Sequence, residues 1–399
     1  MAKTRRRGVL QGGDDVEESA RTGSLTVVGT GIVSVGQLTL EAIGWIRSAD
    51  IVCYGLAEPV TERWLVDNAR EAEDLACFYD EDSRRVVSYR NMAERLLHHV
   101  RAGKRVVGVF YGHPGVFVDP AHRAIEIARR EGYPAVMLPG VSAEDCLFAA
   151  LGVDPGRIGC ETYEATEMLM RGRRPSPDTH VIIWQIGVVG NLGFQPENAP
   201  SDLTGLAEYL MTIYPPDHLV THYQGAQYAV CESVADEFQV RELASIQTSG
   251  ASTLYIPPAV TRPLDESMLA ALGIPSAPPP ELADEPDGRS LPGRDWYVPL
   301  SPGRSRVADL LIRLSDDPAG LAAYEADPVG YLSAAGLDPV EQWALLSRNH
   351  RAIAACARLG SGPEAVVSMG LADDVEQART YSVTADGRLM RPKRRQAAD

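Results

Sequence analysis

The chain has few cysteines and no spacing of them that is typical of a metal site or a disulfide framework. Its six cysteines are scattered, and none forms a CxxC pair. No signal peptide is evident, so we expect reduced thiols, a cytoplasmic protein and no bound metal. Long apolar runs are also missing, because no stretch approaches the roughly 18 residues that a membrane-spanning helix needs. The sequence therefore gives no reason to expect a membrane partner.

The chain also lacks an excess of positive charge. Asp and Glu number 54 against 38 Lys and Arg, which gives a net charge of −16. Two short basic stretches, at residues 3–7 and 391–395, lie near the ends, and solvated charge is enough to explain them. A nucleic-acid surface needs a clustered excess of basic residues, so we expect no nucleic-acid partner.

Strand and helix patterns alternate through the first two thirds of the chain. SLTVVGTGI, which begins at residue 24, is typical of a buried strand that runs into glycines. Residues 38–49 have helical spacing, and residues 50–56 form a second apolar strand. The alternation recurs as far as residue 258, which predicts an α/β fold with a largely parallel sheet.

The remaining segments differ in composition. Residues 1–23 are polar and charged, and we expect them to be disordered. Residues 259–304 are rich in proline, which predicts an extended connection without regular helix or sheet. Residues 305–360 contain repeated helix starts in which a capping residue precedes a proline, which predicts a small helical domain. Residues 361–399 form a C-terminal tail.

Three glycine-containing turns follow predicted strands, within residues 27–39, 109–117 and 137–152. In α/β sheets, ligands bind at the carboxyl ends of strands, so these turns are candidates for a binding crevice into which Tyr111 and His113 project. Each signal alone is weak. The first turn is not G-x-G-x-x-G and is equally consistent with a plain tight turn, a lone histidine is usually structural, and helix capping explains the polar residues of the third.

In their order and spacing, the three turns resemble the tetrapyrrole methylase family, S-adenosylmethionine-dependent methyltransferases whose two α/β subdomains hold the cofactor between them. The first turn continues as IVSVG, where that family usually has Pro-Gly-Asp. SLTVVGTGI, VVGVFYGHPGVFVDPAHRAI and EGYPAVMLPGVSAEDCLFA resemble more closely the borosin peptide backbone α-N-methyltransferases. That resemblance implies a methyltransferase domain at 24–258, with subdomains 24–136 and 137–258, followed by a Pro-rich clasp and a small helical domain that binds the precursor.

The resemblance also implies a catalytic segment, FYDEDSRRVVSY, at residues 78–89. Tyr79, Arg85 and Tyr89 match the family's catalytic residues, whereas Ala76 stands where relatives have a further tyrosine. Methylating an amide nitrogen requires removal of its proton and stabilisation of charge on the carbonyl oxygen. A tyrosine beside an arginine suits this task, because the cation favours phenolate and lowers its pKa. From composition alone, these residues would be solvated surface.

S-adenosyl-L-methionine is the cofactor that the resemblance implies, with S-adenosyl-L-homocysteine as the product. Small residues, hydroxyls and an amide suit the edges of adenosine. The positions that match the family's cofactor site are Tyr111, His113, Val116, Ala143, Gln185, Gly225, Ser252 and Thr253.

The tail is, by the same resemblance, the substrate, with a methylated window near residues 381–389. We expect modification at Tyr381, Ser382, Val383, Thr384 and Ala385. The resulting hypothesis is a self-modifying enzyme of ribosomal peptide biosynthesis that methylates backbone amides of its own C-terminal peptide, in trans within a homodimer. Two alternatives remain: a methyltransferase of the same fold that acts on a separate peptide or small molecule, and a carrier that binds the cofactor without turnover.

Overall fold

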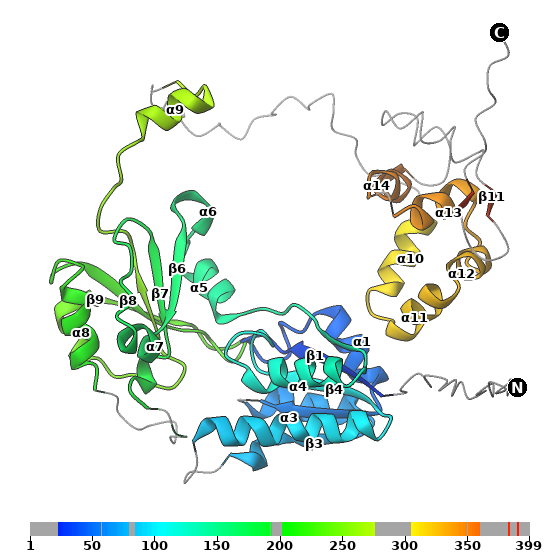
Figure 1. The fold of residues 1–399 in the computed structure, drawn as a ribbon, viewed down its shortest axis with the longest axis horizontal. Coiled ribbons are helices and arrows are strands. Elements are labelled where there is room, and N and C mark those ends of the chain that lie inside the picture. Colours follow the sequence, from blue (N-terminus) through cyan, green and yellow to red (C-terminus); the bar gives the residue numbers. More distant parts are fainter. Residues whose placement is uncertain are drawn as a thin grey trace, which may run out of the picture.

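Two five-stranded sheets are followed along the chain by a helical module (Figure 1). This computed structural model describes residues 23–56, 58–79, 84–191, 193, 202–275, 305–348, 350–359, 382–383 and 389–390. The expected disorder of residues 1–22 and the expected extended course of residues 276–304 lie outside these ranges. No helix in the described ranges is long and apolar enough to cross a membrane.

The first sheet is parallel and has the order β3-β2-β4-β1-β5. Its strands are β1 Ser24–Gly29, β2 Ile51–Gly55, β3 Ala72–Asp74, β4 Arg105–Phe110 and β5 Ala135–Met137. Its helices are α1 Leu40–Ser48, α2 Pro59–Asn68, the 3-10 helix η1 Leu75–Phe78, α3 Arg85–Arg101 and α4 Asp119–Arg130. The central strands are almost wholly apolar, because helices cover both of their faces.

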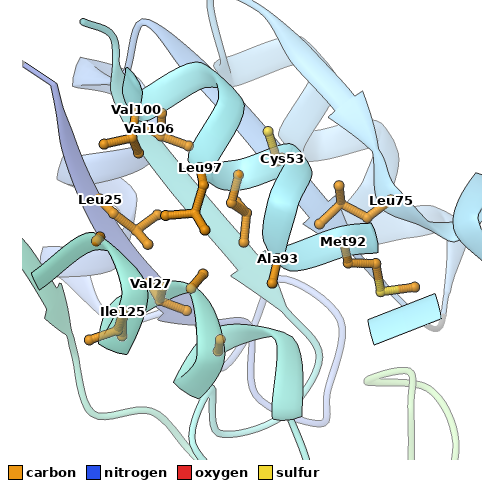
Figure 2. Packing of buried hydrophobic residues seen from close by; sticks show 14 of the residues in the cluster. Leu25, Val27, Cys53, Leu75, Met92, Ala93, Leu97, Val100, Val106 and Ile125 are labelled. Carbon is orange, nitrogen blue, oxygen red and sulfur yellow. The ribbon is translucent and has the colours of Figure 1, made fainter. Parts of the chain in front are cut away.

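Helices α3 and α4 cover one face of the first sheet. Figure 2 shows Ala93 and Leu97 of α3 and Ile125 of α4 against Leu25 and Val27 of β1. All five side chains are at most 6% exposed. This packing fixes the position of α3, whose first five residues include two of the predicted catalytic residues.

The second sheet is mixed and has the order β6-β7-β10-β8-β9. Its strands are β6 Cys160–Glu164, β7 His180–Trp184, β8 Leu219–Gln224, β9 Val234–Gln239 and β10 Thr253–Ile256. Around it lie α5 Ala143–Leu151, α6 Pro155–Ile158, α7 Ala165–Met170, η2 Ile186–Val188, α8 Thr204–Met211 and η3 Val240–Ser245. The predicted fold class, two α/β subdomains followed by helices, is confirmed, but β10 runs antiparallel to both of its neighbours.

A short helix, α9 Glu266–Leu272, lies inside the segment predicted to be without regular structure. That prediction is wrong here because no proline interrupts residues 264–274. The carboxylate of Asp265 caps the helix by accepting a hydrogen bond from the backbone N–H of Met268 (3.0 Å), and Gly273 ends it with φ 67°.

The helical module buries a core of its own. It contains α10 Arg306–Leu314, α11 Pro318–Ala326, α12 Pro328–Ala334, α13 Pro339–Leu346 and α14 His350–Leu359. The predicted helix starts are confirmed: Asp317, Asp327 and Asp338 each cap a helix whose first residue is proline. Beyond the module, β11 Ser382–Val383 pairs antiparallel with β12 Leu389–Met390.

Candidate active site

The three glycine turns predicted to form a crevice meet through their backbones. Gly31 and Gly112 exchange two hydrogen bonds, with N to O distances of 3.3 and 3.0 Å. A Cβ on Gly29 would lie 2.1 Å from the carbonyl oxygen of Gly112, and one on Gly140 would lie 3.5 Å from the Cα of Gly29. Glycine is needed at Gly29 because its neighbour there is rigid main chain.

The first turn has its own support, which the sequence analysis missed. The Gln37 side-chain oxygen accepts hydrogen bonds from the backbone N–H groups of Ile32 (2.7 Å) and Val33 (3.0 Å). The Gln37 amide nitrogen donates to Cys146 Sγ in α5, at 3.3 Å. Gln37 therefore shapes the IVSVG continuation and joins it to the second half of the methyltransferase.

Several predicted cofactor residues follow β4. Burial raises the pKa of Tyr111, so its phenol stays protonated. His113 Nδ1 accepts a hydrogen bond from the Gly115 N–H (3.0 Å), which gives this histidine a structural role in the turn. Val116 is 40% exposed, and Phe117, with φ 58°, packs edge-on against Trp184 at a centroid distance of 6.1 Å.

The other predicted cofactor residues come from the second sheet. Gln185 follows β7 in the left-handed region, with φ 59°, and Ala143 is the first residue of α5. Gly225 follows β8, and a Cβ there would lie 2.9 Å from Ile32 in the first turn. The turns after β1 and β8, one from each half, therefore touch.

Ser252 and Thr253 are buried at the start of β10. The Ser252 hydroxyl oxygen accepts a hydrogen bond from Ser249 N–H (2.8 Å) and lies 2.8 Å from His222 Nε2. Burial lowers the pKa of His222, although Asp236 opposes this shift, so the imidazole is neutral at pH 7. Sequence reasoning missed His222 because its spacing from Ser252 has no local signature.

Taken together, these residues suit an adenosine-containing cofactor. Gly225 allows Ile32 of the first turn to approach closely, Ala143 has only a small side chain, Gln185 supplies an amide, and Val116 offers an exposed apolar surface. The donor set therefore fits S-adenosylmethionine.

The predicted catalytic residues lie together where α3 begins. Tyr79 follows η1, Arg85 is the first residue of α3, and Tyr89 lies one turn later. The two tyrosine rings are edge-to-face, with centroids 6.4 Å apart. Arg85 Nη2 donates to the carbonyl oxygen of Asn191 at 2.7 Å, so this end of α3 contacts the second half of the methyltransferase.

The expectation that the arginine lowers the tyrosine pKa is wrong in net direction for Tyr79. Partial burial raises the pKa of Tyr79, a residue that is still 39% exposed, to about 12, and the neighbouring Tyr89 adds to the shift. Arg85 acts in the predicted direction, but its effect is smaller than that of burial. Tyr79 is therefore a neutral phenol at pH 7 in this state.

One group of potential metal ligands was not foreseen. Cys53, Glu73 and His99 place ligand atoms within 4.8 Å of one another. Burial would raise the pKa of Glu73, but hydrogen bonds from Arg95 and His99 hold it below its usual range. Burial also raises the pKa of Cys53 to about 12, so its thiol is protonated. The Glu73 carboxylate is thus already satisfied by an arginine and a histidine.

All six cysteines lie in the described ranges, and each is a free thiol, as predicted.

Comparison with known proteins agrees with this fold. The family model for Tetrapyrrole (Corrin/Porphyrin) Methylases matches residues 24–224. A methyltransferase/ribosomally synthesized type I borosin cyclic peptide precursor of Mycena rosella is 40% identical over 348 residues, which cover 82% of this chain and 87% of that protein. A type I borosin precursor of Coprinopsis marcescibilis is 39% identical over 376 residues, covering 88% and 96%.

The omphalotin A precursor methyltransferase of Omphalotus olearius is 36% identical over 366 residues, covering 83% of this chain and 87% of that protein. The chain therefore belongs to the borosin precursor methyltransferases, within the tetrapyrrole methylase family. The resemblance that its glycine turns predicted is confirmed, and the protein is an S-adenosylmethionine-dependent methyltransferase.

Proposed function

We propose that this enzyme methylates backbone amide nitrogens of its own C-terminal peptide. The observation that carries the proposal is the assembly of Tyr79, Arg85 and Tyr89 at the start of α3, against residue 191 of the other half. Relatives of nearly the same length are named as methyltransferases joined to a cyclic peptide precursor. The chain likewise continues beyond its helical module into a tail that contains the candidate window.

The chemistry assigns a different task to each group. An amide nitrogen is a poor nucleophile because its lone pair is delocalised into the carbonyl. When bound, S-adenosylmethionine would supply the electrophilic methyl group from its sulfonium and would leave as S-adenosylhomocysteine. The phenolate form of Tyr79, which lies in contact with Tyr89, accepts the amide proton, and the Arg85 guanidinium stabilises the negative charge on the amide oxygen.

The cofactor site proposed for this reaction combines both halves of the methyltransferase. Its residues come from the turn after β4, the start of α5, and the segments around β7, β8 and β10. They are Tyr111, His113, Val116, Ala143, Gln185, Gly225, Ser252 and Thr253.

The pKa of Tyr79 predicts a methylation rate that rises with pH. A phenolate base must lose its proton, and a pKa of about 12 leaves little phenolate at neutral pH. Below the pKa, the phenolate fraction grows about tenfold per pH unit. Single-turnover rates from about pH 7 to about pH 10 should therefore rise with a logarithmic slope near one. Tyr79→Phe should flatten this slope, whereas a flat wild-type profile would contradict the assignment of Tyr79 as the base.

The proposed substrate window is Tyr381, Ser382, Val383, Thr384 and Ala385. Ser382 and Val383 form β11, whose extended backbone suits a segment threaded past a fixed methyl donor; the other three residues lie outside the described ranges. Incubation with S-adenosylmethionine should add mass in steps of about 14 Da, since each step replaces one N–H by N–CH₃. Tandem mass spectrometry should locate these steps at residues 381–385. An unmodified tail, in a preparation that methylates a separate peptide, would show that the tail is not the substrate.

We also propose that the reaction occurs in trans within a homodimer. Leu264, Met268 and Leu272, on and beside α9, are between 54% and 69% exposed and need an apolar surface to cover them. Two full-length chains can test this: one carries Arg85→Ala, and the other carries Met390→Leu, a mass label outside the window whose mass change no number of methyl groups reproduces. After co-expression, methyl groups should appear on the Arg85→Ala chain. Their confinement to the Met390→Leu chain would refute transfer between subunits.

A further inference from the structure

Gly44, in the middle of α1, has no local reason to be glycine. It sits in a nine-residue helix, where glycine is less favourable than alanine by about 1 kcal/mol. Its φ lies outside the left-handed region that only glycine adopts easily. The reason for the missing side chain therefore lies in what Gly44 touches.

The helical module approaches α1 at this residue. A Cβ on Gly44 would lie 2.3 Å from the carbonyl oxygen of Asp316, in the turn between α10 and α11, and 2.9 Å from Cδ of Pro318, the first residue of α11. The first neighbour is main chain and the second is a proline ring, so neither can rotate away. Helices α1 and α11 are in contact, and Figure 1 shows the module beside α1.

The contact continues on either side of Gly44. Side chains from both elements line one hollow of about 320 Å³ between them. Leu40, Glu41 and Trp45 line it from α1, and Leu314, Ser315, Pro318 and Leu321 line it from the module. The residues that line this hollow are therefore mainly apolar, with Glu41 as the one acidic residue among them, and Gly44 lies between Glu41 and Trp45 on α1.

We propose that Gly44 is a positioning residue that lets the helical module dock on the methyltransferase and so fixes where the tail begins. This inference rests on the proposed function, because it assumes that the tail is the substrate. About 20 residues separate Leu359, the end of α14, from the window at 381, so the window cannot reach further than roughly 70 Å from the docked module.

Loss of docking would lengthen that reach. The module would then be joined to the enzyme only through the connection that includes residues 276–304, about 30 residues that add at most roughly 100 Å. The volume available to the window grows with the cube of the reach, and its effective concentration falls by roughly tenfold. Docking thus raises the methylation rate without contributing a group to the chemistry.

The test compares full-length Gly44→Ala with the matched control Gly205→Ala. Gly205 also lies in a helix, α8, but a Cβ there has nothing within 4 Å. Both changes favour the helix, so only the contact with the module distinguishes them. Hydrogen exchange should show lost protection at residues 40–48 and 314–321 in Gly44→Ala alone. Tail methylation should slow roughly tenfold, with unchanged affinity for S-adenosylmethionine.

A second variant changes the helical module instead of α1. Leu321→Glu places a carboxylate in the hollow that Glu41 lines, so it should reproduce both effects without changing α1. Normal protection and a normal rate in Gly44→Ala would overturn the proposal. Weaker binding of S-adenosylmethionine would overturn it too, because the damage would then lie in the first sheet. An unmethylated wild-type tail would instead refute the proposed function, and the positioning role with it.

Discussion

Arg85→Ala is expected to lower the rate of methyl transfer by about 10² to 10⁴ while leaving the affinity for S-adenosylmethionine unchanged. The Arg85 guanidinium is the cation at the tyrosine pair, and its loss leaves charge on the amide oxygen without a partner. Tyr79→Phe and Tyr89→Phe should also slow the reaction, because each removes a hydroxyl from the proton-accepting pair. Single-turnover kinetics and calorimetric titration would measure the two quantities separately.

Arg84→Ala is the matched control for this prediction. Arg84 immediately precedes Arg85, and its side chain is exposed. Its backbone forms the bridge to Gly193, which the substitution leaves in place. The Arg84→Ala variant should retain its activity. Normal rates in the Arg85 and both tyrosine variants would show that catalysis resides in another segment.

Gly29→Ala is expected to separate the glycine turns. The added Cβ would lie 2.1 Å from the Gly112 carbonyl oxygen and 2.7 Å from Pro114 Cδ, so β1 and the turn after β4 cannot both keep their positions. Overpacking of this kind destabilises by about 1–3 kcal/mol. Thermal unfolding should begin at a lower temperature, and affinity for S-adenosylmethionine should fall by at least about tenfold, since roughly 1.4 kcal/mol corresponds to that factor.

Gly36→Ala provides the comparison within the same turn. Its Cβ would meet no atom closer than 3.7 Å, an ordinary contact. Melting curves and binding isotherms of this variant should overlay those of the wild type. Equal damage from both substitutions would mean that the turn tolerates no side chain at all, and the argument from the Gly112 contact would be lost.

Features set by neighbouring residues could be predicted from the sequence. The Ser142 capping box and the Asp-Pro starts of α11, α12 and α13 depend on groups a few residues apart. The glycine turns were visible for the same reason. Alternation of apolar strands with helices was enough to define the fold class. The strand β9 was not predicted, because four of its six residues are exposed and its sequence therefore has no apolar pattern.

Contacts between distant residues could not be predicted. Gln37 and Cys146 are 109 positions apart, and His222 and Ser252 are 30 apart, so no spacing rule connects them. The pKa of Tyr79 was misjudged for a related reason: the sequence shows a nearby arginine but not the burial that outweighs it. These long-range hydrogen bonds and the pKa of Tyr79 both depend on how distant segments of the chain pack together.

The separate core of the helical module has a consequence for how the enzyme can change. Val307, Leu310, Trp343 and Ala355 are buried among themselves and not among residues of the two sheets. In the part of the chain that the structure describes, every residue assigned to these cores precedes Leu359. The described cores are thus built without the segment proposed as cargo, an architecture suited to new peptide sequences and to the grafting of foreign ones.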